Sequence, residues 1–573
     1  MTGCFDGNGH SIKGLKVNEP SGSYRGYGLF GDVTGSVVNV NVEGSVLAIK
    51  MNVGGIVGYA NGGTEISVCY SSGSVTAESG ISGGIVGNLT GKLTDCFSSA
   101  EVSGIYNVGG IIGSVNNDPT VTNCIFAGKV KCTEGTHGGI SGQEGGSYTN
   151  CYYLSGSFDS GNYDTKVGTV LSPVKLASLT DDNLGGAWES GSVGTDLTEA
   201  DGKYHIYKRD CTFPKLSKMA EVVTGSAEYY NFGIDGKDDY LAFTAIKTVD
   251  DLKNIEKDVT GNYVIMVDEL DASGMKTLCD SDNKFGGKLA GNGCKLTLSK
   301  PLFEYNNGLV MGINAAGTID GSSKYNYGAI ARENSGGTIY GCSFSGSLTA
   351  YGYAGGVCGT NDDGGAVRNC YNTGTVTAQD EYAGGIVGLT SSSTTVSECY
   401  NTGSVSGNET VGGIVGGSEK NSKISDCLNT GRITGENNVG GIVGVAYETT
   451  VTGVLNAGIA YAPGYYGCIS GTSTSGSSYD NCYFIAELSA ANYSGKGTGV
   501  SIGNIAELNL GSAWNTGSLG TLSAADSDGF KSQPVTLPSL KESGSAQTAV
   551  AYQFNFKENP SDKACIPELR KGR

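Results

Sequence analysis

The chain has 573 residues, more than one ordinary domain needs, and 95 of them are glycine. Only 16% of the residues are charged and the formal net charge is −19, which argues against a nucleic-acid partner, because such partners need clustered Lys and Arg. No apolar run of about 18 residues occurs, so we expect no transmembrane helix and no direct membrane insertion by this part of the protein.

One segment of the form Gly-Gly-Ile-Val-Gly recurs early in the chain, at residues 53–58, 82–87, 108–113 and 137–142. About a dozen residues after each copy comes a cysteine, in the series Cys69, Cys96, Cys124 and Cys151, with steps of 27, 28 and 27 residues. A fixed period of this length is typical of a solenoid. The repeats are rich in Val, Ile, Thr and Gly and lack helical spacing, so we predict short strands that pair with the copies above and below at about 4.8 Å.

The first array is assigned to residues 1–220, with its N-terminal cap missing, and residues 221–247 are interpreted as a linker. Trp188, late in the first array, is predicted to form a lid over the open end of the core, because terminal repeats must be atypical. A short helix is expected from Thr248, since Thr248 can cap it and Asp251 stands three positions further on. This helix is predicted to plug the first coil of the second array, and a strand at 263–267 follows it.

The second array, residues 248–545, repeats the pattern at 354–359, 383–388, 411–416 and 439–444. Its cysteine series is Cys342, Cys370, Cys399, Cys427 and Cys482, with Val454 in one place, and Trp514 stands where the first array has Trp188. Residues 546–573 form a tail that we interpret as the start of a further module. The predicted fold class is all-β: a right-handed parallel β-helix in two tandem arrays, with a short capping helix before the second.

Strand alternation sorts each repeat into two faces. Cys399 shares its face with Asn401, Gly403 and Val405, and the Val column marks this face as the core. We therefore predict that the cysteines are buried, reduced thiols, since no Cys-x-x-Cys pair suggests a metal site. The same solenoid core is predicted to hold a column of isoleucines, namely Ile56, Ile85, Ile111, Ile386, Ile414 and Ile442.

The residue after each cysteine is predicted to point outward, and it is often aromatic. The candidate ligand-binding residues are Tyr70, Phe97, Tyr371 and Tyr400, with Thr373 and Thr402 beside them. Aromatic faces with hydroxyl neighbours suit sugar rings. The alternative is a purely structural ladder of stacked rings, which the interruptions at Ile125, Leu428 and Leu455 favour.

The Gly-Gly-Ile-Val-Gly segments, together with Cys-Tyr-Asn-Thr-Gly at 370–374 and 399–403, resemble the GLUG-motif repeats of bacterial cell-surface proteins. The resemblance implies a large secreted or surface-attached bacterial protein. Some members of that group are adhesin-like, and others carry the repeats beside a zinc endopeptidase that cleaves immunoglobulin A. The expected localisation is therefore extracellular, on the bacterial cell surface, but the resemblance implies no particular ligand.

Residues that could perform catalysis are sparse. The three histidines, His10, His137 and His205, lie far apart and no His-Glu-x-x-His occurs, so a zinc peptidase is not predicted. Carboxylate pairs at 181–182, 238–239, 250–251 and 362–363 fall in predicted loops or caps. We predict no catalytic residue, no metal and no cofactor: a non-enzymatic, adhesin-like module whose partner is a glycan or host surface. The alternative is a carbohydrate-processing β-helix enzyme, a lyase or glycoside hydrolase, and the oligomeric state stays open.

Overall fold

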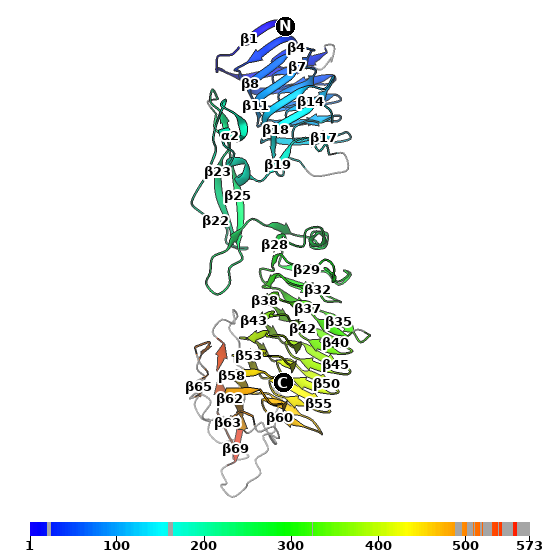
Figure 1. The fold of residues 1–573 in the computed structure, drawn as a ribbon, viewed down its shortest axis with the longest axis vertical. Coiled ribbons are helices and arrows are strands. Elements are labelled where there is room, and N and C mark those ends of the chain that lie inside the picture. Colours follow the sequence, from blue (N-terminus) through cyan, green and yellow to red (C-terminus); the bar gives the residue numbers. More distant parts are fainter. Residues whose placement is uncertain are drawn as a thin grey trace. The chain divides into compact units, whose positions relative to one another are not determined.

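The computed structural model describes residues 1–19, 25–158, 164–219, 221–323, 325–486 and 496–500, short pieces between 508 and 540, and residues 554–557. The chain divides into two compact units, Met1–Asn231 and Phe232–Arg573. Strand β25 (Thr224–Asn231) lies within the predicted linker and belongs to the first unit. Both units contain a stack of parallel strands (Figure 1), which confirms the predicted all-β solenoid.

In the first unit, the strands that carry the cysteines pair in parallel, and Cys96 lies between Cys69 and Cys124 in register. These strands are β8 (Glu65–Ala77), β11 (Lys92–Ser98), β15 (Thr120–Phe126) and β18 (Ser147–Leu154). The glycine-rich segments supply β6 (Asn52–Gly54), β9 (Ile81–Gly83), β13 (Val108–Gly109) and β17 (His137–Gly138) in one stack, and β7 (Val57–Ala60), β10 (Val86–Leu89) and β14 (Ile112–Val115) in another. One repeat therefore makes one coil, as predicted.

The second unit repeats this arrangement with shorter strands. The stack beside the cysteines holds β43 (Ala366–Arg368), β44 (Tyr371–Asn372), β48 (Thr395–Ser397), β49 (Tyr400–Asn401), β53 (Lys423–Ser425) and β54 (Leu428–Asn429). Two further stacks hold β42 (Cys358–Asp362), β47 (Val387–Thr390), β52 (Val415–Ser418) and β57 (Val443–Ala446), and β40 (Ser347–Ala350), β45 (Thr375–Ala378), β50 (Val405–Gly407) and β55 (Arg432–Gly435). The fourth holds β36 (Asn326–Gly328), β41 (Tyr353–Gly355), β46 (Tyr382–Gly384), β51 (Thr410–Gly412) and β56 (Val439–Gly440).

The second unit begins with the predicted helix. Helix α3 (Val249–Lys253) has Thr248 as its N-cap, and the side chains and backbone of Thr248 and Asp251 form a reciprocal capping box. The chain continues as a 3-10 turn, η1 (Asn254–Lys257), and then as strand β28 (Asn262–Ile265). Leu252 and Ile255 are fully buried in the core cluster of the second unit, so the helix packs on the solenoid core as expected.

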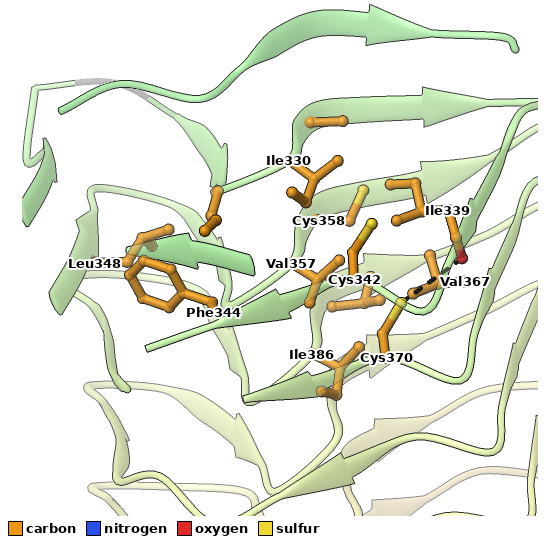
Figure 2. Packing of buried hydrophobic residues seen from close by; sticks show 14 of the residues in the cluster. Ile330, Ile339, Cys342, Phe344, Leu348, Val357, Cys358, Val367, Cys370 and Ile386 are labelled. Atoms are coloured by element: carbon orange, nitrogen blue, oxygen red, sulfur yellow. Dashed lines mark hydrogen bonds between the residues drawn. The ribbon is translucent and has the colours of Figure 1, made fainter. Parts of the chain in front are cut away.

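The core of each unit is built from columns of identical positions. All six isoleucines of the predicted column are fully buried, which confirms their assignment. Cys69, Cys96, Cys124, Cys370, Cys399 and Cys427 are also fully buried and free of disulfides. Figure 2 shows Cys342, Cys358 and Cys370 packed among Ile and Val side chains, with the Cys370 thiol donating to the carbonyl of Ile339 at 3.7 Å. The cysteines therefore act as small apolar side chains.

We expect Cys370 and Cys399 to resist thiol reagents in the folded chain. Burial raises the pKa of both thiols, which keeps the reactive thiolate scarce. Ellman's reagent followed by peptide mapping should modify the exposed Cys4 quickly and both buried cysteines only after denaturation. Equal labelling of all three in the native chain would contradict this arrangement.

A residue with positive φ precedes each cysteine of the two cysteine series. Its φ is +51° at Asn123, +52° at Asn369 and +56° at Glu398. Asn, Asp and Gly tolerate this conformation best, and they fill most of these places. The bend turns the chain between two strands without reversing the predicted faces, because Asn401 and Val405 remain fully buried.

The buried asparagines form a ladder along the second unit. The amide of Asn401 donates to Asn429 at 2.9 Å and accepts from Asn372 at 2.8 Å. Asn401 also donates to the carbonyl of Gly403 at 3.0 Å and accepts from its backbone N–H at 3.2 Å. The side-chain amide of Asn429 donates in turn to the side-chain oxygen of Asn456 at 2.8 Å. Each side-chain amide thus forms hydrogen bonds with the backbone turn of its own coil and with the asparagine of the next coil. Because its polar atoms are hydrogen-bonded, the side chain can lie in the core.

Candidate functional site

The aromatic row predicted from the sequence lies on the outer side of the cysteine-bearing strands. Tyr371 and Tyr400 pair in register on β44 and β49, and their rings stack with centroids 4.9 Å apart and planes 3° apart. Thr373 and Thr402 are exposed beside them. The direction predicted for these side chains, away from the solenoid core, is confirmed in this part of the row.

The predicted exposure of Tyr70 and Phe97 is wrong, because a later segment of the first unit covers them. Tyr70 is 2% exposed and Phe97 is fully buried. They pack in one cluster with Trp188, and the covering segment is built from α1 (Pro173–Ala177), β20 (Trp188–Glu189) and β24 (Lys215–Leu216). The Trp188 ring meets Phe97 edge-on at 6.3 Å, and its indole N–H donates to Asp95 at 3.2 Å.

In the second unit, too, a later segment of the chain packs on part of the aromatic row. Tyr400 is only 7% exposed, since it clusters with Leu510 and Trp514, so its predicted exposure is also wrong. Trp188 and Trp514 therefore lie on the flank of their solenoids, and the predicted lid over the open end is incorrect. Alternation fixes the direction in which a side chain leaves the strand, but it does not reveal what packs on it.

A different group of aromatic residues is exposed in the second unit. Tyr325 and Tyr351 are 46% and 44% exposed, and Tyr353 and Tyr382 are partly exposed. The Tyr325 ring lies 5.1 Å from Tyr353 and 6.1 Å from Tyr351, and Tyr353 lies 5.3 Å from Tyr382. We call these four residues the tyrosine cluster, and they come from three consecutive coils.

The register between neighbouring strands brings these tyrosines to the same corner of consecutive coils. Tyr353 on β41 pairs with Tyr382 on β46 and with Asn326 on β36, so Tyr325 precedes its strand at the corresponding corner. A Cβ on Gly352 would come within 2.9 Å of the Tyr325 ring, so glycine leaves the room that this ring needs. The sequence signal was available, because a Tyr stands directly before the segments 354–359 and 383–388. The prediction of an aromatic row used only the residues that follow the cysteines and therefore did not include these tyrosines.

Two carboxylates border the tyrosine cluster. The Tyr325 hydroxyl donates to Glu381 across two coils, and this bond raises the pKa of Tyr325 to about 12. Asp380 likewise raises the pKa of Tyr351 through a hydrogen bond and its charge. Neither carboxylate forms an ion pair with a Lys or Arg in the described residues. The site therefore combines aromatic faces, hydroxyls and carboxylates.

Three of the four carboxylate pairs noted in the sequence contain a residue with a structural contact. Asp251 caps α3, Asp239 pairs with Lys288, and Asp362 accepts from Ser391 at 2.7 Å. Within the ranges that the structure describes, no group of three or more His, Cys, Asp or Glu side chains could hold a metal ion. None of the helices in those ranges has the length and apolar character needed to span a bilayer.

Residues 350–377 match the family model described as the GLUG motif. The chain carries a GLUG motif. The GLUG segment forms one coil, from the end of β40 through β45, and holds Tyr351 and Tyr353 as well as Tyr371. Ala354 of this coil pairs with Ala383 of the next, so the GLUG coil and its neighbour stack in register.

Two solved structures are similar to parts of the chain. A chain from Bacteroides ovatus, described as a candidate immunoglobulin A1 protease, is 17% identical with a TM-score of 0.35, and the match covers 55% of this chain and 94% of that one. A chain described as IgA1 protease is 18% identical with a TM-score of 0.33, covering 52% of this chain and 25% of that one. These TM-scores are too low to carry an argument. The comparison with curated proteins finds no match.

Proposed function

We propose that the chain is a non-enzymatic, extracellular repeat module that binds glycans through the tyrosine cluster and displays this surface on a solenoid. The observation that carries the proposal is the exposure of four neighbouring tyrosines on consecutive coils, with hydroxyl and carboxylate groups at their border. Sugars offer apolar faces and polar rims, which such a surface complements. The GLUG motif supports an extracellular setting through the resemblance to surface proteins.

The row identified from the sequence is a weaker candidate for the same function. Tyr70, Phe97 and Tyr400 are covered, and only Tyr371, Thr373 and Thr402 keep exposed surface. Tyr371 also donates to Asn314 at 3.4 Å, which is a structural contact. The stacked rings at Tyr371 and Tyr400 support the structural-ladder alternative, and glycan binding at this row stays a prediction.

Replacing Tyr325 and Tyr351 together by Ala is expected to weaken glycan binding at least about tenfold, because each ring contributes about 1 kcal/mol of contact. The full chain and the variant should be compared on a glycan array and then by calorimetry with the best ligand. Tyr447→Ala is the matched control, since Tyr447 is a similarly exposed tyrosine of the same unit outside the cluster.

Unchanged binding by the double variant would overturn the assignment to the tyrosine cluster. A full chain that binds no glycan would instead favour a role as a spacer. Release of reducing ends from a polysaccharide, lost on replacing a single Asp, would contradict the non-enzymatic part of the proposal and favour the carbohydrate-processing alternative.

A further inference from the structure

We infer that the tyrosine cluster selects glycans that carry free amino groups, an inference that rests on the proposed glycan-binding function. The ring planes are the first reason. Tyr325 and Tyr353 meet at 75°, Tyr353 and Tyr382 at 54°, and Tyr325 and Tyr351 at 50°. Rings set at such angles face in several directions, so a sugar can stack on one ring while the edges and hydroxyls of its neighbours remain available to a polar or charged group. They present several faces and hydroxyls to a small charged group, as in the recognition of ammonium ions by aromatic rings.

The charge around the rings is the second reason. Glu381 accepts from the Tyr325 hydroxyl, which orients the ring and places a carboxylate at its edge. Asp380 lies next to Glu381 in sequence and raises the pKa of Tyr351, while burial and the charges of Glu419, Glu381 and Glu409 raise the pKa of Tyr382. A neutral sugar gains little from this negative charge. An ammonium group gains both a cation–π contact and a charge-assisted hydrogen bond.

The placement of the rings along the stack favours a repeating ligand. Tyr325, Tyr353 and Tyr382 belong to consecutive coils, and neighbouring strands of a sheet lie about 4.8 Å apart. In a β-1,4-linked chain each sugar is turned over relative to the last, so the amines on one side recur at every second sugar. Such amines can meet cluster members two coils apart, such as Tyr325 and Tyr382, whose strands are separated by about 9.6 Å. Weak individual contacts then add up through repetition. We accordingly assign the ligand as an amino-sugar oligomer with free amines, such as β-1,4-linked glucosamine.

The test compares two oligosaccharides of equal length, β-1,4-linked glucosamine and its N-acetylated form, by calorimetry with the full chain at fixed ionic strength. We expect the free-amine form to bind about tenfold or more tightly than the acetylated form. Glu381→Gln keeps the size of the side chain and an acceptor for Tyr325, so it should reduce this preference to about twofold while binding of the acetylated form persists. Asp380→Asn provides a second, independent variant with the same expectation.

The control variant is Glu436→Gln, which removes one exposed carboxylate from the same unit outside the cluster and should leave the preference unchanged. If both oligosaccharides bind equally and depend on Tyr325 and Tyr351, the inference fails while the proposed function stands. If neither binds and no other glycan does, the proposed function itself fails. If a lysine-rich peptide binds through the tyrosines and the glucosamine oligomer does not, the ligand is a basic peptide and the inference is overturned.

Discussion

Replacing Asn401 by Leu is expected to make the surrounding coils open about a thousandfold more often. Leucine fills a similar volume, but it removes the four hydrogen bonds that Asn401 makes with the N–H and carbonyl of Gly403 and with the amides of Asn372 and Asn429. A buried polar group without a partner costs about 1–3 kcal/mol. Losing several at once should cost about 4 kcal/mol, which corresponds to the stated change in the opening equilibrium.

Hydrogen exchange measured by mass spectrometry on the full chain tests this result, because it reports on coils separately and does not assume that both units unfold together. Faster exchange is expected in peptides that cover β44, β49 and β54. Thr402→Val is the matched control, since Thr402 is the next residue and is exposed. Similar exchange in Asn401→Leu and Thr402→Val would show that the asparagine ladder contributes little to stability.

Replacing Trp188 by Ala is expected to release the covering segment of the first unit, at a cost of about 3 kcal/mol. The change removes a buried ring that packs against Phe97 and deletes the indole donor to Asp95. Because Tyr70 and Phe97 lie beneath this segment, its release should expose an apolar strip on the flank of the solenoid.

Hydrogen exchange in peptides covering 173–216, together with binding of an apolar dye, measures this release. We expect exchange to accelerate about a hundredfold in that segment, which is the factor that about 3 kcal/mol implies. Exchange in β11 and β15 should change much less. Val170→Ala serves as the control, because Val170 is an exposed residue of the same unit. If the segment remains protected without Trp188, the smaller contacts of Phe213 and Leu216 suffice to hold it.

The sequence by itself determined the coil, the register and the inward face. In a solenoid the main contacts join equal positions of neighbouring repeats, so a local pattern already specifies them. The isoleucine column, the buried cysteines and the inward position of Asn401 followed from period and alternation alone. The cap at Thr248 was equally accessible, because a capping box involves residues only three positions apart.

Only the tertiary structure decided which aromatic residues face solvent. Trp188 reaches Asp95 from 93 residues away, and no repeat position indicates that the segment around it folds back on the row that holds Phe97. The tyrosine cluster likewise depends on Tyr325 reaching Glu381 across 56 residues. Alternation gives each side chain a direction, but exposure depends on non-repeating segments that lie distant in sequence. For that reason the predicted aromatic row is largely covered, and the exposed aromatic residues, the tyrosine cluster, lie at another corner of the coil.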